Sequence, residues 1–324
     1  MKERQIEEHK TVLLEKAIEV LQIKNGNTII DATLGNGGHT LKMLQAVGTG
    51  GQVIALDLDK IAIDKFRTKI EDKFPELNDR LILVNDNFKN IKGILARLYA
   101  RGGIKSSQVH AILADLGWRI EQVKDKKYGM SFREDAPLDM RFDLRKNSLT
   151  AYQIINEWSS KELANIFLEL GEEREARQIA QSIVISRQKK RIETTGQLAK
   201  IISVSKKARN KKIHPATKVF QALRIVVNEE FSNLNKFLED AVNVLKSEGR
   251  LAIISFHSLE DRLVKNFFRA KARGCVCSKE IPVCNCGQKR EIKIVFSKGV
   301  APDAKEIFLN RRSRSARMRV AQKI

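Results

Sequence analysis

The chain has 324 residues, of which 42% are hydrophobic, which is enough for a folded core and for about two domains. Lysine and arginine number 60 against 39 acidic residues, so the formal net charge is +21 at pH 7. This excess is larger than solubility requires and is typical of proteins that bind a polyanion such as nucleic acid. Neither a membrane-spanning apolar stretch nor the apolar core of a secretory signal is visible, so we expect a cytoplasmic protein with no membrane partner.

Short apolar runs alternate with helical patterns over residues 28–117. The runs are Thr28–Ala32, Gln52–Leu58, Leu81–Asn85 and Val109–Asp115. Strands that are separated by amphipathic helices imply right-handed crossovers, and therefore a parallel sheet in an α/β fold. Later strands are predicted over Arg250–Phe256, Glu291–Ser297 and Arg317–Ala321.

The composition changes at Trp118, where long charged segments with apolar residues at helical spacing begin. Ala151–Leu170 and Glu173–Arg187 are examples, and Pro215–Phe231 is predicted as a helix of the resumed α/β pattern. We therefore predict one α/β domain, made of residues 1–117 and 214–324, that is interrupted by an all-helical domain of residues 118–213.

A glycine-rich loop, Asp31–Thr40, follows the first predicted strand and leads into a helix predicted over Leu41–Ala46. Glycines at such a turn let a nucleotide-type ligand approach the backbone. Thr40 stands where a dinucleotide-binding loop has its third glycine, so a nicotinamide-dependent oxidoreductase is the weaker alternative. S-adenosylmethionine has no phosphates, and Asp31 before the loop suits its ammonium group, although Asp31 also fits as a cap of the turn.

Three further side chains follow the ends of the next predicted strands. Asp57, preferred here over Asp59, has the spacing from the glycine loop that a carboxylate needs to accept both ribose hydroxyls. Phe88 offers a ring for the adenine face or packs in the core, and Asp115 ends the fourth strand. In this order and spacing, the four elements predict a class I methyltransferase that uses S-adenosylmethionine.

Beyond these elements, long motifs resemble the RsmH (MraW) family. They are Asp31–Thr40, Asp115–Gly117, Gly129–Phe132, Pro137–Arg141, Gly171–Arg174, His214–Lys218, Phe220–Arg224, Ser255–Arg262 and Arg312–Ala316. The resemblance implies a Rossmann-like class I methyltransferase with an inserted helical domain that recognises RNA. It also implies N4-methylation of a decoding-centre cytidine in small-subunit ribosomal RNA, with the RNA or the 30S particle as partner.

Carried over by position, the cofactor contacts of the family fall along the first part of the chain. They are Gly37, Gly38, His39, Asp57, Phe88, Asp115 and Gln122. The segment Trp118–Lys124 keeps Gln122 but lacks the two serines usual in the family, and Tyr128 and Met130 replace an arginine and a phenylalanine. This departure motivates an alternative function: an RNA-binding ribosome-assembly factor with the methyltransferase fold but weak or absent activity.

Direct methyl transfer to a cytosine amine needs alignment and an acceptor for the protons of that amine. Asp115 or a group within Ser255–Asp261 is predicted to supply the acceptor, and His257 is a second candidate catalytic residue. A Ser-Leu-Glu-Asp run after a strand also fits a helix N-cap with acidic residues in the first turn, so both interpretations of this segment remain open.

Basic residues cluster in Arg187–Arg191, Lys206–Lys212 and Arg311–Arg319, which together predict an RNA-binding track. In the last cluster, the alternation also fits one solvated face of a strand. The sequence is compatible with a homodimer.

All four cysteines lie between residues 275 and 286. Zinc ribbons more often place two residues between paired cysteines than the one found in each pair here. We therefore predict reduced thiols packed in a hairpin and no metal, with a structural zinc ion as the alternative. The four residues are Cys275, Cys277, Cys284 and Cys286.

Overall fold

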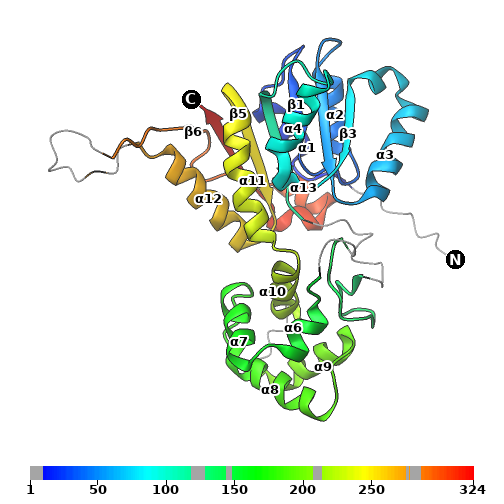
Figure 1. Ribbon diagram of the computed structural model, residues 1–324, viewed down its shortest axis with the longest axis vertical. Coiled ribbons are helices and arrows are strands. Elements are labelled where there is room, and N and C mark those ends of the chain that lie inside the picture. Colours follow the sequence, from blue (N-terminus) through cyan, green and yellow to red (C-terminus); the bar gives the residue numbers. More distant parts are fainter. Residues whose placement is uncertain (1–9, 118–127, 144–147, 207–213, 275–276, 278–285) are drawn as a thin grey trace. The chain divides into compact units, whose positions relative to one another are not determined.

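The computed structural model describes residues 10–117, 128–143, 148–206, 214–274, 277 and 286–324 (Figure 1). The chain forms two compact units, one of residues 1–117 and 233–324 and the other of residues 118–232, called here the sheet unit and the helical unit. Within the described ranges, no helix has the length and apolar character needed to cross a membrane.

The sheet unit contains seven strands in the order β3-β2-β1-β4-β5-β7-β6. Their bounds are β1 Thr28–Asp31, β2 Gln52–Asp57, β3 Leu81–Asn85, β4 Val109–Asp115, β5 Leu245–Ser255, β6 Ile292–Ile294 and β7 Arg317–Lys323. The first five run parallel, and β7 is antiparallel to both β5 and β6. The strand order reverses between β1 and β4, which is where open α/β sheets bind ligands, beyond the carboxyl ends of the strands.

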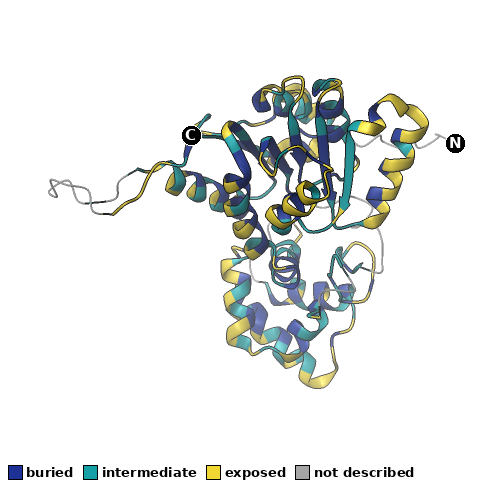
Figure 2. Cartoon of the chain, turned by 45° about the horizontal axis from the view of Figure 1, so that its top comes forward, coloured by how far each residue is buried: buried dark blue, intermediate teal, exposed yellow. Residues whose placement is uncertain are grey.

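Helices cover both faces of this sheet because adjacent strand residues point to opposite sides. Ile29 packs with α1, α2 and α3, whereas Ile30 packs with α4, α11 and α12. The helix bounds are α1 Leu14–Leu21, α2 Gly38–Ala46, α3 Lys60–Lys73, α4 Ile91–Ala100, α11 Glu230–Val244, α12 Ser258–Ala272 and α13 Ala304–Leu309. Short 3-10 segments are η1 Pro75–Arg80, η2 Phe88–Asn90 and η4 Arg311–Ser315. Figure 2 shows the buried residues concentrated on the strands and on the inner sides of these helices.

The predicted α/β class is confirmed, and the first four strands lie within one residue of their predicted bounds. The prediction for β5 was wrong at its start, because pairing begins at Leu245 rather than Arg250. Leu245 pairs with Val109 before a register shift, and Glu248 has φ 66°. A polar, irregular segment therefore hides the early part of the strand from a pattern of apolar residues.

The helical unit consists of short helices around its own apolar core. They are α6 Ala151–Glu157, α7 Ser160–Glu169, α8 Ala176–Lys189, α9 Thr195–Ser205 and α10 Thr217–Val227. The segment with helical spacing over Ala151–Leu170 forms two helices, because Ser159 begins α7 with a capping box to Glu162. Thr150 and Thr194 start α6 and α9 in the same way, so local sequence sets all three starts.

The compact helical unit ends at Ser232, beyond the predicted boundary at residue 213. Apolar residues of α10, including Val219, Phe220 and Leu223, belong to the core of the helical unit. The helix predicted over Pro215–Phe231 therefore packs with the helical unit and ends at Val227, since Glu229 adopts φ 50°. An apolar helix face does not specify which core it joins, so only the contacts decide its membership.

Candidate active site

The glycine loop connects β1 to α2, and two of its glycines are required by close protein neighbours. A Cβ at Gly37, which has φ 75°, would lie 2.0 Å from the ring of Phe66. A Cβ at Gly38 would lie 1.9 Å from Oγ1 of Thr11. Both predicted cofactor contacts thus sit where any side chain would collide with the packed fold, and only their backbone is available to a ligand.

Gly35 differs from these two, because its surroundings are open. It has φ 54°, and apart from its chain neighbours the described residues place a single heavy atom within 4 Å of a Cβ built there, the carbonyl oxygen of Thr33 at 3.9 Å. Sequence reasoning did not select Gly35 as a site residue, although it is the first glycine of the loop motif. The structure adds it as a position where a ligand can approach the backbone.

Asp31, at the end of β1, is fully buried and holds the loop in place. Its carboxyl group accepts a hydrogen bond from the backbone of Thr33 at 3.1 Å and from the hydroxyl of Thr40 at 2.6 Å. These two hydrogen bonds are those expected if Asp31 caps the turn that follows β1, and a contact with the ammonium group of the donor stays a prediction. Burial raises the pKa of Asp31 to about 7, because the two hydrogen bonds only partly offset the loss of water.

Asp57, at the end of β2, faces the glycine loop. One carboxylate oxygen accepts from the backbone N–H of Gly35 at 2.9 Å, and the other accepts from the backbone N–H of Asp59 at 2.8 Å. The Asp59 side chain caps α3 by accepting from Ile61 at 2.8 Å. Asp57 therefore contacts the glycine loop, whereas Asp59 caps a helix, and the ribose-binding role of Asp57 stays a prediction.

Phe88 follows β3 at the start of η2 and is half-buried. Its ring packs edge-on against Phe237, with the ring centroids 5.0 Å apart. Phe88 therefore packs against the core, which is one of the two roles that the sequence allowed. The ring remains partly accessible, so stacking on an adenine stays a prediction.

Asp115 ends β4 and has an unpaired carboxyl oxygen. Its Oδ1 is buried and has no hydrogen-bond partner among the residues that the structure describes. Burial raises the pKa of Asp115 well above its usual value, and the nearby carboxyl groups of Asp31 and Glu260 raise it further. A buried acceptor without a donor is unfavourable by itself, and such groups concentrate at functional sites.

His39 lies in the first turn of α2, beside Asp115, with its Nδ1 3.9 Å from Asp115 Oδ2. Burial lowers the pKa of His39 to about 4, so the ring is neutral at pH 7. Its Nε2 lies 3.2 Å from the carbonyl oxygen of Val12 and must donate to it, since a carbonyl only accepts. The ring therefore presents an unprotonated Nδ1 on the side of Asp115.

His257 caps α12 from the end of β5. Its Nδ1 accepts from the backbone of Glu260 at 3.4 Å, and its Nε2 lies 3.0 Å from a Glu260 carboxylate oxygen. The helix-capping interpretation thus describes this segment, with His257 as the cap, and a catalytic role for His257 stays a prediction. Asp261 forms two hydrogen bonds with Arg319, at 2.6 and 2.8 Å, so it stabilises the fold.

The structure therefore brings Asp31, His39 and Asp115 together and joins Asp57 to the glycine loop. Glu260 joins the acidic group from a distant part of the chain, which its position after the fifth strand already suggested. Gln122 lies outside the described residues. Of the four cysteines, only Cys277 and Cys286 are among the described residues, so the hairpin and zinc alternatives stay predictions.

A donor molecule that carries positive charge fits this edge of the sheet. Asp31 is buried, and Asp115 is half-buried with its Oδ1 out of contact with solvent. Both carboxyl groups have raised pKa values, and neither pairs with a lysine or arginine within the described ranges. S-adenosylmethionine carries a sulfonium and an ammonium group, and a bound cation favours the ionised form of such acids. The reversed strand order and these acidic groups at the carboxyl edge of the sheet define a Rossmann-like methyltransferase that uses S-adenosylmethionine.

The model of the MraW methylase family matches residues 6–324, and the chain belongs to this family. A relative from Halothermothrix orenii, named ribosomal RNA small subunit methyltransferase H, is 45% identical over 98% of this chain and 99% of its own length. A protein of the same name from Brevibacillus brevis is 40% identical and covers 98% of each chain. A solved rRNA methylase structure from Streptococcus thermophilus covers 98% of this chain and 99% of its own. Its sequence identity to this chain is 11% and its TM-score is 0.42, so it carries no part of the argument.

Proposed function

We propose that this protein transfers a methyl group from S-adenosylmethionine to N4 of a decoding-centre cytidine in small-subunit ribosomal RNA. The observation that carries the proposal is the end-to-end similarity to relatives named for methylation of this RNA, at 40–45% identity. The excess of basic residues supports an RNA substrate, since a net charge of +21 attracts a polyanion. We expect the reaction to take place in the cytoplasm, on the RNA or on the 30S particle.

In this proposal, the donor lies along the glycine loop. Gly35, Gly37 and Gly38 present their backbone to it, and Asp57 accepts hydrogen bonds from its ribose. Phe88 offers a partly accessible ring to its adenine, and Gln122 stays a predicted contact. When bound, S-adenosylmethionine supplies a methyl group on a positively charged sulfur, so transfer needs alignment and no covalent enzyme intermediate.

Asp115 is the proposed proton acceptor for the target amine. The cytosine amine is a weak nucleophile because its lone pair is delocalised into the ring, and it must lose a proton during transfer. The unpaired Oδ1 of Asp115 can accept one of its N–H groups. The raised pKa of Asp115 brings this carboxylate closer to the working pH and makes it a better base than an exposed aspartate.

His39 has a positioning role in this scheme. Its neutral ring is fixed by the hydrogen bond from Nε2 to Val12, and it lines the site without adding a positive charge that would repel the donor. For the helical unit we propose RNA recognition. At the end of α8, Lys189, Lys190 and Arg191 are exposed and suit phosphate contacts, whereas Lys206 is paired with Glu173 at 2.7 Å.

The test is mass spectrometry of small-subunit RNA from cells that lack this protein, combined with methylation of that RNA by the purified chain. We expect the loss of one N4-methylated cytidine and its restoration by the wild-type chain but not by Asp115→Asn. An unchanged methylation pattern would overturn the proposal. Binding to small subunits without methyl transfer would instead favour the assembly-factor alternative that Trp118–Lys124 motivates.

A further inference from the structure

The basic run Arg311–Arg319 divides into two parts with different environments. In β7, Arg319 is only 7% exposed and binds both carboxylate oxygens of Asp261. Arg317 donates to the carbonyl oxygen of Lys298 at 2.6 Å. Arg319 is therefore occupied by its ion pair within the sheet unit, and Arg317 uses one of its donors on the backbone.

The three arginines of η4, Arg311, Arg312 and Arg314, are all exposed. In the part of the chain that the structure describes, none of them pairs with a carboxylate. Three unpaired guanidinium groups within four residues repel one another, so their arrangement does not arise from stabilising contacts. Three neighbouring guanidinium groups are suited to bind a ligand with several negative charges.

Phe308 lies directly before these arginines, in α13, and its side chain is 85% exposed. No residue of α13 is buried, so the helix is held by polar contacts instead of an apolar face. Glu306 accepts from the backbone of Leu13 at 2.7 Å, and Asn310 donates to the carbonyl oxygen of Lys10 at 2.9 Å. The fold thus fixes this helix while leaving its aromatic ring in solvent.

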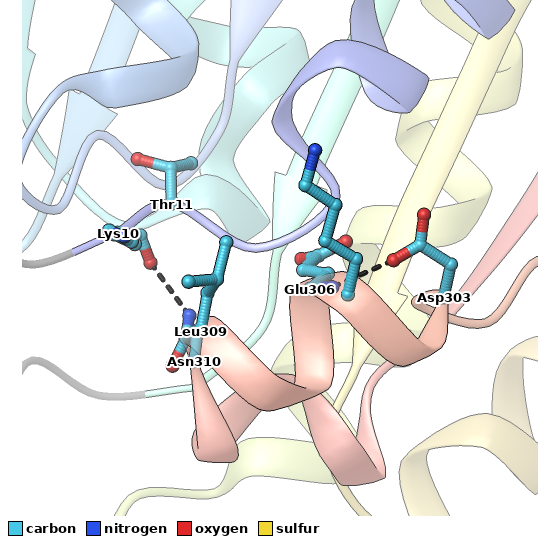
Figure 3. Close-up of a pocket in the computed structure, with 7 residues that line it drawn as sticks. Lys10, Thr11, Asp303, Glu306, Leu309 and Asn310 are labelled. Atoms are coloured by element: carbon cyan, nitrogen blue, oxygen red, sulfur yellow. Dashed lines mark hydrogen bonds between the residues drawn. The ribbon is translucent and has the colours of Figure 1, made fainter.

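The same contacts place α13 near the proposed donor site. Figure 3 shows α13 against Lys10 and Thr11, across a groove of about 240 Å³. Thr11 packs at Gly38 of the glycine loop, and the next residue, Val12, accepts the hydrogen bond from His39. Residues 10–13 therefore connect α13, which carries Phe308, with the glycine loop along which the donor is proposed to lie.

We propose that Phe308, Arg311, Arg312 and Arg314, called here the aromatic–arginine patch, bind a single-stranded segment of the substrate RNA. A base stacks on the Phe308 ring, and the arginines bind the phosphates on either side of it. Stacking needs an unpaired base, whereas the bases of a duplex are stacked on one another. The inference rests on the proposed function, because it assigns the RNA a second contact on the sheet unit.

The first test measures the affinity of the full chain, saturated with S-adenosylhomocysteine, for a short single-stranded RNA that contains 2-aminopurine. Phe308→Ala is expected to weaken binding about tenfold and to remove the quenching that reports stacking, whereas Phe308→Trp retains both. The triple variant Arg311→Gln, Arg312→Gln and Arg314→Gln is expected to lower the slope of log affinity against log salt by about 2, since each single-strand phosphate contact contributes about 0.7.

A matched control exists at the opposite end of the strands. Tyr99 is 53% exposed, and Arg101 and Lys105 are exposed beside it, before β4 begins. The variants Tyr99→Ala, Arg101→Gln and Lys105→Gln remove the same chemistry and are expected to leave RNA affinity unchanged. Equal losses in both sets, or no loss in Phe308→Ala, would overturn the proposal. So would a change of sedimentation in Phe308→Ala with unchanged RNA affinity, which would assign the ring to contact with a second copy of the chain.

Methylation kinetics on unmethylated small subunits separate this inference from the proposed function. We expect Phe308→Ala to raise KM for the particle about tenfold and to leave kcat unchanged, because the patch binds RNA away from the reacting atoms. If the wild-type chain methylates and the KM of the variant does not change, this inference fails and the function stands. If the wild-type chain does not methylate, the function fails, and the RNA-binding measurement then decides the patch by itself.

Discussion

Polar groups in the interior of the helical unit are paired with opposite charges, whereas the acids at the carboxyl edge of the sheet are not. In the helical unit, Glu173 pairs with Lys206 at 2.7 Å, and Arg224 binds Glu230 through two hydrogen bonds, at 2.6 and 2.9 Å. At the carboxyl edge of the sheet, the buried Asp31 and the half-buried Asp115 have raised pKa values and no lysine or arginine partner among the described residues. Paired groups stabilise a fold, whereas buried acids without a partner lower its stability unless a bound ligand supplies a hydrogen-bond donor or a positive charge.

This difference indicates which motif residues serve the fold and which serve the chemistry. Asp139 and Arg141, in one of the long motifs, bind each other at 2.8 Å, and Asn228 holds the backbone of Met140 at 2.8 Å. A motif in a sequence therefore does not by itself indicate contact with substrate. The polar groups that lack protein partners are the better candidates for that contact.

The largest expected effect is on Asp115. Asp115→Asn keeps the shape of the side chain but removes its capacity to take a proton, so methyl transfer is expected to fall about 10³-fold. Stability at pH 8 is expected to stay the same or to increase, because an acid with a raised pKa is unfavourable when ionised. The measurements are single-turnover transfer to small subunits and urea unfolding.

The control for that prediction is Asp64→Asn, which alters an exposed acid that pairs only with Lys60 in α3. It is expected to leave transfer unchanged. Transfer by Asp115→Asn within about twofold of the wild type would remove Asp115 from the mechanism and weaken the contrast between the units.

The paired groups of the helical unit are expected to act on stability instead. Glu173→Ala leaves Lys206 partly buried without its partner, so the free energy of unfolding of this unit should fall by about 3 kcal/mol. Urea unfolding followed by a probe in the helical unit measures this. Lys60→Ala, in an exposed pair, should change stability by less than about 0.5 kcal/mol. Similar small changes in both variants would contradict the assigned role of the buried pair.

Two substitutions in the glycine loop, Gly37→Ala and Gly35→Ala, can be compared within the sheet unit. Gly37→Ala is expected to lower stability by about 2 kcal/mol, because φ is positive and the new methyl group would meet the Phe66 ring. Gly35→Ala has open space, so its stability should fall by only about 1 kcal/mol. Calorimetry should nevertheless show a several-fold loss of S-adenosylmethionine affinity in Gly35→Ala. Unchanged affinity would place the donor elsewhere.

The smallest expected effect is the pH dependence from Asp31. Its pKa of about 7 lies above the ordinary value of 3.8, so the folded free protein binds the proton more tightly and loses stability as the pH rises from about 4 to about 7. A cationic donor favours the ionised carboxylate, so its affinity should rise up to about tenfold between pH 6 and pH 8. Calorimetry across this range measures the rise.

Asp31→Asn should reduce this rise in donor affinity, and the double variant Asp31→Asn and Asp115→Asn should abolish it, because the pKa of Asp115 is raised as well. His39 does not contribute to it, since its pKa of about 4 keeps the ring neutral over the whole range. An undiminished rise in Asp31→Asn would assign the titration to groups other than Asp31.

The sequence by itself determined the parallel sheet, the glycine loop and the position of Asp57. These depend on local properties, namely the alternation of apolar runs with helical spacing and the distance of a carboxylate from a turn. Capping signals such as Ser159 with Glu162 are equally local and mark the start of α7 in the sequence.

Only the tertiary structure decided which core α10 joins, and that Arg319 is paired with Asp261 while Arg311 has no carboxylate partner among the described residues. Each of these depends on contacts between residues that are far apart in the chain. Burial and pairing are properties of such contacts, and they set whether a charged residue stabilises the fold or remains available to a ligand.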